Sequence, residues 1–553
     1  MKDLLIKQIF ELKGYRKPEE GENYYEELLD NYERTYNFYK KLTVEQLEKN
    51  LKLEKIHAES LRKKNRIARD YTLMMDAYEL FMSDTYVKTK KGVEGVFDVF
   101  YRVVPNGGGY TVMAGLDKVI EYIKDLKFDE WDIEYFKNAG YKFSEEFLDY
   151  LRNFKFTGDI YAIPDGTPVF PNEPLITVKA PLIEAQIVET ALLSFINGSM
   201  EHATGARRII EATPKNVPVM EFGARRADGP EAALDSSIYG IMAGCAGTSN
   251  VLAARMYDMK ALGTMAHSFI ETFDTEYEAF LAFALDHPDN ATLLVDTYDT
   301  LRIGIPNAIK VFNYMKEHGI RTDKIGIRID SGDLAYLSKE ARRMLDEAGF
   351  PQAKICLSNG LTAETIESLI AQGACFDSLG VGDNISKPAG RMGAVYKEVA
   401  VVENGKVIPK IKVSGDVIKI VNPDFKDLYR AYDKETGYAV ADVMCTRGKK
   451  INAKDLKIVS LKDFIKSTTL NNVVLKKLQQ PIFLDGHLVY KDPTLLEKKA
   501  YCEEQMKTLY PEVKRTLNPH EYYVDGTEEY VNMKNEMIRR MREQKWEEIK
   551  ESW

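Results

Sequence analysis

Residues 324–333, KIGIRIDSGD, show the pattern that decides the fold: a short apolar run that ends in a cluster of polar residues. The same pattern recurs in VMEFGARR (219–226), ATLLVDTYDT (291–300), AKICLSNG (353–360) and FDSLGVGD (376–383). Helical patterns follow these runs, and this alternation is typical of βα units on a parallel sheet. We therefore predict an α/β barrel or a doubly wound sheet between about residues 218 and 398.

The spacing of the polar clusters supports this interpretation. Asp296 and Asp330 are 34 residues apart, Asp330 and Asn359 are 29 apart, and Asn359 and Gly382 are 23 apart. Each interval has room for a strand, a helix and a loop. The polar clusters should then lie at the carboxyl ends of strands, where barrels and open parallel sheets build their ligand sites.

Two other regions have a different texture. The first seventy or so residues are rich in Lys, Glu and Tyr, and residues 96–181 contain short β-rich runs between Gly and Pro turns, which predicts a mixed α+β domain. A set of apolar residues near the N-terminus repeats at the three-to-four-residue spacing of a helix face: Tyr25, Leu28, Tyr32, Tyr36 and Tyr39. We interpret this stripe as the buried face of an amphipathic helix rather than as a stacking platform for bases.

At 553 residues the chain is longer than a single hydrophobic core usually supports. We divide it into a helical N-terminal extension (1–70), an α+β domain (71–200), an α/β barrel (201–420) and a C-terminal segment (421–553). The last segment is expected to return to the α+β domain and to end in helices. The N-terminal extension is expected to pack on the barrel or on a dimer surface.

Composition excludes several classes of function. The net charge of -9 argues against non-specific nucleic-acid binding, which needs a basic face. No run approaches the roughly 18 apolar residues of a membrane span, and no export signal is visible. The five cysteines are scattered, which fits neither a disulfide framework nor a zinc site. We therefore expect a cytoplasmic protein that does not bind a membrane.

Glycine-containing clusters at two predicted strand ends are candidates for phosphate binding. In Ser358-Asn359-Gly360 and in residues 380–383, GVGD, glycines allow close backbone approach, and N–H groups at a following helix can cradle a phosphate. Either cluster alone could equally be a tight turn. In residues 328–333, RIDSGD, the carboxylates could bind ribose hydroxyls or Mg²⁺, although Asp333 could instead cap the next helix.

Two further clusters carry candidate side chains. Phe222 is followed by Arg225 and Arg226, a combination suited to an aromatic acid, with surface salt bridging as the alternative. Residues 263–268, GTMAHS, place His267 among small residues at the end of a candidate strand. A lone histidine is more often structural, so only the surrounding pattern makes His267 a functional candidate.

In chain order, these clusters resemble those of nicotinate phosphoribosyltransferases from about Tyr71 to Lys397. The matching segments are LMMDAYELFM (73–82), FYRVVPNGGGYTVMAGL (100–116), EFGARRADGP (221–230), GTSNVLAA (247–254), GTMAHSF (263–269), RIDSGDL (328–334), SNGL (358–361) and GVGD (380–383), and NPHEYYV (518–524) also looks similar. The resemblance implies a type II phosphoribosyltransferase, with an irregular α/β barrel joined to an N-terminal α+β domain. It also implies a head-to-tail homodimer with shared active sites.

The resemblance assigns roles to single residues. Tyr78 would stack on the substrate ring from the partner subunit, opposite Phe222, and His267 would be the phosphorylated histidine. The remaining positions would line the nicotinate, ribose and phosphate pockets: Arg225, Arg226, Ser249, Arg328, Asp330, Ser331, Gly332, Asn359, Gly360, Gly382 and Asp383. Asp383 stands where many relatives carry a neutral hydroxyl, so Lys387 or Arg391 could supply the charge for the phosphate instead.

The implied reaction joins nicotinate to phosphoribosyl pyrophosphate, forming nicotinate mononucleotide and pyrophosphate with ATP hydrolysis, in NAD salvage. It needs Mg²⁺ and positive charge on the leaving group rather than a Ser or Cys nucleophile; the sequence does not identify metal ligands. Ser249 stands where amide-using relatives carry an Asp, which favours nicotinate over nicotinamide. The alternatives are a nicotinamide-using enzyme, a non-catalytic paralogue that only binds phosphoribosyl ligands, and a metal-dependent barrel hydrolase.

Overall fold

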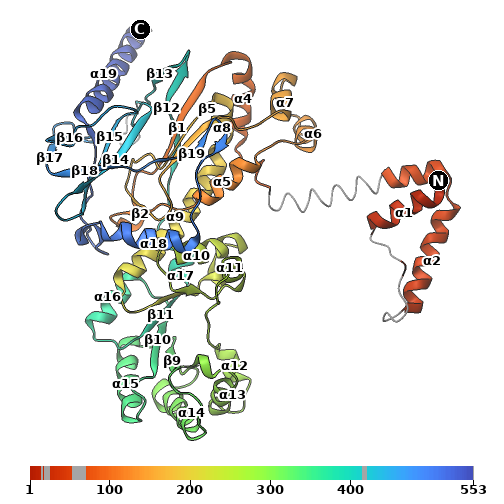
Figure 1. Cartoon of the computed structure of the whole chain (residues 1–553), viewed down its shortest axis with the longest axis vertical. Helices are drawn as coiled ribbons and strands as arrows, with labels where there is room; N and C mark the ends of the chain where they lie inside the picture. The colour runs from red at the N-terminus through yellow and green to blue at the C-terminus, as the bar shows by residue number, and fades with distance from the viewer. Residues whose placement is uncertain (14–16, 18–24, 53–69, 414–419, 552–553) are drawn as a thin grey trace. The chain divides into compact units, whose positions relative to one another are not determined.

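The computed structural model describes residues 1–13, 17, 25–52, 70–413 and 420–551. The chain divides into two compact units, Met1–Met74 and Met75–Trp553, and each is described here by itself. Figure 1 shows the elements of both units with their labels. No helix of the described part of the chain is long and apolar enough to cross a membrane.

The first unit is helical. It contains α1 (Lys2–Lys13), α2 (Tyr25–Lys41) and a further helical stretch over residues 44–52. Its core is formed by six buried residues: Ile6, Ile9, Phe10, Tyr39, Leu47 and Leu51. The Phe10 ring meets the rings of Tyr32, Tyr36 and Tyr39 edge-on at centroid distances of 5.3, 6.1 and 5.8 Å.

These contacts confirm that the tyrosine stripe is the packed face of an amphipathic helix. The side chains of Tyr25 and Leu28 lie outside the described residues. The site at which this unit packs on the rest of the protein stays a prediction.

A parallel sheet forms the barrel part of the second unit. Its strands are β6 (Val219–Glu221), β7 (Gly247–Thr248), β8 (Ala291–Leu294), β9 (Ile325–Ile329), β10 (Lys354–Ser358) and β11 (Ser378–Val381), in the order β7-β6-β11-β10-β9-β8. Every neighbouring pair is parallel. The sheet runs from β7 to β8 without closing among the described residues, so the barrel is irregular, as expected.

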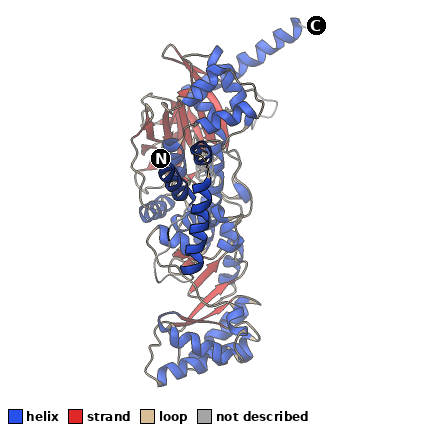
Figure 2. Cartoon of the chain, turned by 90° about the vertical axis from the view of Figure 1, so that its right-hand side faces the viewer, coloured by secondary structure: helices blue, strands red, loops and turns tan. Residues whose placement is uncertain are grey.

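Helices connect and cover these strands (Figure 2). They are α10 (Pro230–Met242), α11 (Val251–Met256), α12 (His267–Glu271), α13 (Glu276–Asp286), α14 (Ile305–Glu317), α15 (Leu334–Glu347), α16 (Ala363–Ala371) and α17 (Asp383–Ser386). In α15, the Asp333 side chain accepts the N–H of Tyr336 at 3.0 Å, so Asp333 caps the helix rather than facing a ligand. Gly349, with φ +81°, follows its last turn and lets the chain leave the helix.

The predicted strand before His267 is wrong. No strand is assigned between α11 and α12, and His267 is the first residue of α12. The segment instead runs extended beside β7, where the Leu262 N–H donates to the Thr248 carbonyl at 2.9 Å. Apolar residues alone did not distinguish a paired strand from an extended segment that makes one such hydrogen bond.

An antiparallel sheet of seven strands forms the second layer of this unit. It contains β13 (Lys406–Pro409), β12 (Val395–Glu403), β1 (Glu94–Phe100), β5 (Ile176–Pro181), β3 (Asp159–Ala162), β19 (Gln480–Leu484) and β20 (His487–Leu488), in that spatial order. Segments from before and after the barrel therefore share one sheet. The predicted antiparallel strands between residues 96 and 181 are confirmed.

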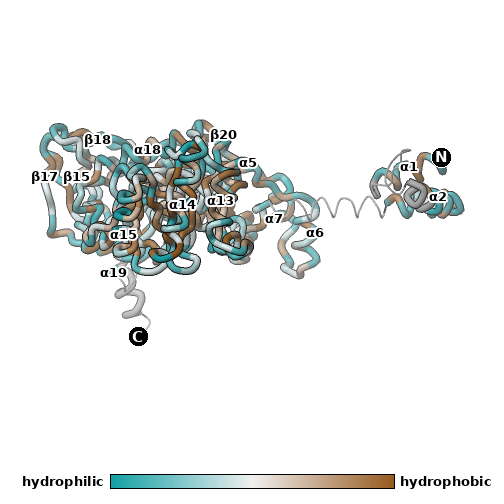
Figure 3. The backbone as a smooth tube through the Cα atoms, turned by 90° about the horizontal axis from the view of Figure 1, so that it is seen from below, coloured by the Kyte–Doolittle hydropathy of each residue, from teal (hydrophilic) through white to brown (hydrophobic). Residues whose placement is uncertain are grey.

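The helices of this part are α4 (Ala77–Thr89), α5 (Leu116–Asp125), α6 (Glu130–Asn138), α7 (Glu145–Arg152), α8 (Leu182–Ile187) and α9 (Glu189–Ala212). The 24-residue α9 packs against α10, α16 and α17 of the barrel and against β2 (Thr111–Val112), which pairs with β4 (Pro168–Val169). It therefore joins the two parts of the unit. Figure 3 shows hydrophobic residues gathered in the interior of this unit.

The C-terminal segment builds a third sheet and two helices. The sheet contains β17 (Ser467–Leu470), β16 (Leu456–Ser460), β21 (Val524–Thr527), β15 (Ala439–Thr446), β14 (Lys426–Asp433) and β18 (Val473–Lys477), and the helices are α18 (Leu495–Lys507) and α19 (Glu528–Glu551). Buried ion pairs anchor this segment. Arg430 binds Asp442 through two hydrogen bonds of 2.8 and 2.6 Å, and both side chains are fully buried. Lys426 pairs with Asp98 of β1.

We expect the Arg430→Met variant to unfold at a clearly lower temperature. It would leave the Asp442 carboxylate buried without its cation, and breaking a buried pair in this way typically costs about 3–5 kcal/mol. Calorimetric thermal unfolding measures the shift. The control is Arg343→Met on α15, which breaks only exposed ion pairs with Glu340 and Glu347 and should change the midpoint little. Equal shifts in the two variants would contradict the anchoring role of Arg430.

Candidate active site

Three polar side chains meet where β9 and β10 end. The Arg328 guanidinium donates to the Asp330 carboxylate and to the Ser358 hydroxyl, both at 2.9 Å, and the Ser358 hydroxyl also donates to Asp330. Arg328 is on β9 and Ser358 ends β10, so the parallel pairing of these strands brings the group together. The predicted residues Arg328 and Asp330 are therefore neighbours in space.

The Phe222 ring lies beside this group. The Arg328 guanidinium is 5.7 Å from the centroid of the ring, which allows a cation–π contact. The Phe222 N–H donates to the Val381 carbonyl at 2.8 Å, which places the ring against β11. A Cβ atom at Gly380 would lie 2.7 Å from two ring carbons, so only glycine leaves room for the ring there.

A buried carboxylate, Asp296, joins His267 to the Asp330 turn. Its side chain is 1% exposed, accepts the Asp330 N–H at 3.1 Å and the Ser331 hydroxyl at 2.5 Å, and lies 3.2 Å from His267 Nε2. An ionised Asp296 would hold the hydrogen on Nε2 and leave Nδ1 with a free lone pair. The His267 side chain is 40% exposed, so the ring is accessible from outside.

The strand spacing predicts Asp296 at a strand end but does not identify its role in the site. The signal was present, because Asp296 ends the apolar run ATLLV just as Asp330 ends the run IGIRI. Strand β8 neighbours β9 in the sheet, and the two strand ends therefore place both aspartates at one edge.

Arg225 and Arg226 lie on an exposed turn after β6. Arg226 Nε is 3.3 Å from the Asp383 carboxylate, and both side chains are more than half exposed. Asp383 therefore faces an arginine across the strand ends. The two cations considered as alternatives for the phosphate, Lys387 and Arg391, both pair with Asp228, and Arg391 also pairs with Glu201 at 3.1 Å.

The turns after β9 and β10 contain residues in left-handed backbone conformations, which allow tight turns and the close approach of a ligand to the backbone. Gly332, Asn359 and Gly360 have φ values of +81°, +86° and +61°, and all three are exposed. A Cβ atom at Gly382, which follows β11, would lie 3.3 Å from the Phe222 carbonyl oxygen. The four predicted positions thus share the edge of the sheet that also holds Asp330.

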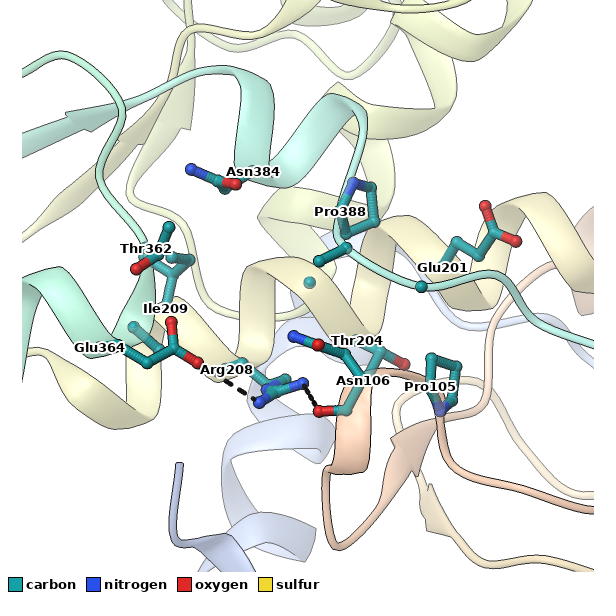
Figure 4. Close-up of a pocket in the computed structure, with 14 residues that line it drawn as sticks. Pro105, Asn106, Glu201, Thr204, Arg208, Ile209, Thr362, Glu364, Asn384 and Pro388 are labelled. Atoms are coloured by element: carbon teal, nitrogen blue, oxygen red, sulfur yellow. Dashed lines mark hydrogen bonds and ion pairs between the residues drawn. The ribbon is translucent and has the colours of Figure 1, made fainter. Parts of the chain in front are cut away.

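A small pocket of about 70 Å³ is bordered by the segments that follow β10 and β11, by α9 and by the turn that contains Asn106 (Figure 4). Arg208 of α9 lies in its wall, 3.4 Å from the Asn106 carbonyl and 3.8 Å from Glu364. The Asn384 amide donates to the Leu361 carbonyl at 2.8 Å and so connects the segments after β10 and β11. These contacts tie the loops to α9 and to the turn that contains Asn106, which supports the loop conformation.

Ser249 and Tyr78 are the two predicted residues outside this cluster. Ser249 directly follows β7, and its N–H donates to the Glu221 carbonyl at 3.0 Å. Tyr78 lies on α4 of the α+β part and is 45% exposed, and the Glu189 carboxylate lies close enough to influence its phenol. Within one chain, no ring contact between described residues joins Tyr78 to Phe222.

The residues on either side of Tyr78, Asp76 and Glu79, are held by contacts with the start of α9. The hydroxyl and the N–H of Thr190 donate to the buried carboxylate of Glu79, and the Asp76 N–H donates to the Thr190 hydroxyl at 3.3 Å. Burial raises the pKa of Glu79 to about 8, so this carboxyl is largely neutral at pH 7. Burial and the nearby Glu189 also raise the pKa of Tyr78. The Tyr78 phenol therefore remains protonated at neutral pH.

The chemistry available at the strand ends is electrostatic. Cations, backbone N–H groups and hydroxyls surround Asp330 and His267, and among the described residues no group of three or more His, Cys, Asp or Glu side chains could hold a metal ion. The arrangement suits an anionic substrate with a sugar that carries phosphates.

Family profiles match three consecutive regions of the chain. They are the nicotinate phosphoribosyltransferase N-terminal domain over residues 73–197, the nicotinate phosphoribosyltransferase family over 217–420 and the corresponding C-terminal domain over 425–534. Residues 1–72 lie outside all three matches.

Curated relatives and solved structures agree with these profiles. The nicotinate phosphoribosyltransferase of Bacillus subtilis is 40% identical over 490 residues, which cover 87% of this chain and 98% of that protein. The Caenorhabditis elegans protein of the same name is 34% identical and covers 82% and 91%. The crystal structure of human nicotinic acid phosphoribosyltransferase matches with a TM-score of 0.72 at 25% identity, over 84% of this chain and 99% of that one. This chain therefore belongs to the nicotinate phosphoribosyltransferase family.

Proposed function

We propose that this protein forms nicotinate mononucleotide and pyrophosphate from nicotinate and phosphoribosyl pyrophosphate, and that it couples the reaction to ATP hydrolysis. The reaction would serve NAD salvage. One observation carries the proposal: in a member of this family, Arg328, Asp330, Ser358, Asp296 and His267 form one hydrogen-bonded network at the strand ends.

The arrangement suggests how the substrates bind. The pyridine ring would stack on Phe222, and its carboxylate would face Ser249 and the arginines of the exposed turn. The 5-phosphate would bind the backbone of the turns at Gly360 and Gly382, and the ribose hydroxyls would bind Asp330. These positions place the pyridine nitrogen and the anomeric carbon close together, which removes much of the entropic cost of the encounter.

Group transfer then needs charge stabilisation rather than a protein nucleophile. The bond from the anomeric carbon to the pyrophosphate oxygen breaks, the pyridine nitrogen forms the new bond, and the electron pair leaves with pyrophosphate. Arg328 would offset charge on the leaving group. Mg²⁺ would enter with the pyrophosphate as part of the substrate, because Mg²⁺ is often held by one or two protein carboxylates and by phosphate oxygens.

His267 would link this transfer to ATP. Its Nδ1 atom would attack the γ-phosphorus, the bond to ADP would break, and the phosphoryl group would later pass to water. Asp296 supports this role because it binds Nε2 and so favours the tautomer with a lone pair on Nδ1. A phosphoryl group at this position adds about two negative charges beside Arg328 and can alter the affinity for pyrophosphate-bearing ligands.

We expect His267→Ala to keep a basal transfer reaction but to lose its stimulation by ATP. The test follows mononucleotide and ADP with nicotinate, phosphoribosyl pyrophosphate and Mg²⁺, with and without ATP. Labelled γ-phosphate should enter wild-type protein and not the variant. His318→Ala, on the exposed end of α14, is the matched control and should behave as wild type. Full ATP stimulation in His267→Ala would contradict the role given to His267.

A head-to-tail homodimer would complete the site. Near Ser249, α11 exposes Val251, Leu252 and Met256 by 70, 53 and 55%. On the α+β part, α4 exposes Tyr78 and Phe81 by 45 and 51%. Exposed apolar residues at these two positions suit an isologous contact across a twofold axis, in which α4 of each subunit meets the strand-end site of the other.

Mixing two inactive variants tests the shared site. Tyr78→Ala and Asp330→Asn should each be nearly inactive alone. In a hybrid dimer, one site carries both changes and the other carries neither, so random exchange of subunits should restore about a quarter of wild-type activity. Each variant alone, at the same total concentration and after the same exchange treatment, is the control. An inactive mixture that demonstrably contains hybrid dimers would show that Tyr78 acts within its own chain.

Position 249 should determine the choice of pyridine. We expect Ser249→Asp to raise the KM for nicotinate at least about tenfold, because a second carboxylate would repel the substrate anion. Turnover of nicotinamide should be unchanged or improved, since its amide can donate to Asp. Ser249→Asn has nearly the same size without the charge and should affect nicotinate much less. Similar losses in both variants would show that shape, and not charge, decides selectivity at this position.

A further inference from the structure

Glu221 is a buried carboxylate that none of the roles above uses. It is the last residue of β6, has no exposed surface, and makes no ion pair with a Lys or Arg among the described residues. A buried carboxylate without a cation needs hydrogen-bond donors, since burying the charge alone is costly. Its surroundings therefore show what it holds in place.

Three donors from three segments meet this carboxylate. The Gly223 N–H donates to one oxygen at 2.5 Å, and the hydroxyls of Ser237 and Thr248 donate to the other at 3.0 and 2.5 Å. Gly223 belongs to the turn after β6, Ser237 to α10, and Thr248 to β7. One side chain thus connects a helix and two strand ends.

The connections extend to the two residues proposed to recognise nicotinate. Phe222 lies between Glu221 and Gly223, both of which belong to the carboxylate's network. Ser249 follows Thr248, and its N–H donates to the Glu221 carbonyl at 3.0 Å. Glu221 therefore fixes the backbone on both sides of Phe222 and next to Ser249.

The hydrogen-bond network continues from Thr248 through Asn250 to α11. The Thr248 hydroxyl oxygen accepts the Asn250 N–H at 3.0 Å, and the Asn250 side chain caps α11 by accepting two N–H groups. A shift of Thr248 would therefore move the whole turn from residue 248 to residue 251.

We propose that Glu221 is a positioning residue that sets the distance between the stacking ring of Phe222 and the Ser249 subsite, and thereby the affinity for the pyridine substrate. The inference rests on the proposed function and specifies how its pyridine subsite is built. We call Glu221, Gly223, Ser237 and Thr248 the Glu221 clamp. The contacts of the clamp lie at β6, β7 and α10, whereas those of Arg328, Asp330 and Asp296 lie at β8, β9 and β10. Loss of the clamp should therefore affect nicotinate more than phosphoribosyl pyrophosphate.

Two substitutions of Glu221 separate hydrogen bonding from volume. In Glu221→Gln, the amide oxygen can still accept the Gly223 N–H, and the amide nitrogen can donate to the Ser237 and Thr248 hydroxyls, because a hydroxyl also accepts. In Glu221→Met, a side chain of similar length leaves the Gly223 N–H and the Thr248 hydroxyl without an acceptor, whereas the Ser237 hydroxyl keeps the Ala233 carbonyl at 2.9 Å. The first variant keeps the clamp without the charge, and the second removes the clamp.

The measurement is the KM for each substrate in the full-length protein, with thermal unfolding as a check of folding. We expect Glu221→Met to raise the KM for nicotinate at least about tenfold and to change that for phosphoribosyl pyrophosphate less than about threefold. Glu221→Gln should keep the KM for nicotinate within about threefold of wild type. A folded Glu221→Met protein with an unchanged KM for nicotinate, or with both KM values raised equally, would overturn the proposal.

Two hydroxyl variants decide the question if Glu221→Met does not fold. Thr248→Val removes the donor next to Ser249, and Ser237→Ala removes a donor to the same carboxylate from the side of α10. Thr248→Val should raise the KM for nicotinate several-fold, and Ser237→Ala should raise it less, because the Ser237 hydroxyl also bonds to the Ala233 carbonyl and Ser237 is not adjacent to Ser249. An unchanged KM for nicotinate in Thr248→Val would contradict the clamp.

Wild-type controls separate this inference from the proposed function. Absence of nicotinate turnover by the wild type would contradict the proposed function. Normal wild-type turnover with unaffected Glu221→Met and Thr248→Val variants would contradict only the clamp.

Discussion

The candidate site depends on the buried carboxylate of Asp296. It binds the backbone of Asp330, the hydroxyl of Ser331 and the ring of His267, so a single charge fixes three groups that are 29 to 35 positions away along the chain. Because β8 and β9 are parallel neighbours, their carboxyl ends place Asp296 and Asp330 side by side. Without the parallel pairing, Asp296 and its partners would not meet, and His267 would be an exposed histidine with no fixed orientation.

The order of the strands determines which part of the site lies at which end of the sheet. Glu221 organises the β7–β6 end of the sheet, and Asp296 organises the β9–β8 end, while β11 and β10 lie between them. Under the proposed function, the sheet would bind pyridine at one end, phosphate in the middle, and ribose, pyrophosphate and His267 at the other end. Two buried carboxylates, each satisfied by several donors, would thus maintain the separation of the two ends that the transfer bridges.

The sequence predicts those parts of the site that depend on a local sequence pattern. Asp330 and Gly382 follow apolar runs of strand length, and parallel sheets place such residues at one edge, so their proximity was predictable. His267 was identified through the resemblance of its segment to a family, and the strand predicted before it was wrong. The contact between Glu221 and Thr248 joins residues 27 positions apart and depends on the register of β6 against β7, which no local pattern specifies.

Under the proposed function, the position of Tyr78 would couple assembly of the dimer to catalysis. Thr190 binds the neighbouring Glu79 and so holds the start of its helix, yet almost half of Tyr78 is exposed. Because its helix is held in place and its ring is partly exposed, Tyr78 would be available to cover an aromatic substrate on another subunit. Phe222 offers one face for stacking, and a second face from a partner would enclose the pyridine and exclude water. If the partner supplies that face, dissociation of the dimer would leave the phosphate-binding loops intact and would remove the pocket for nicotinate.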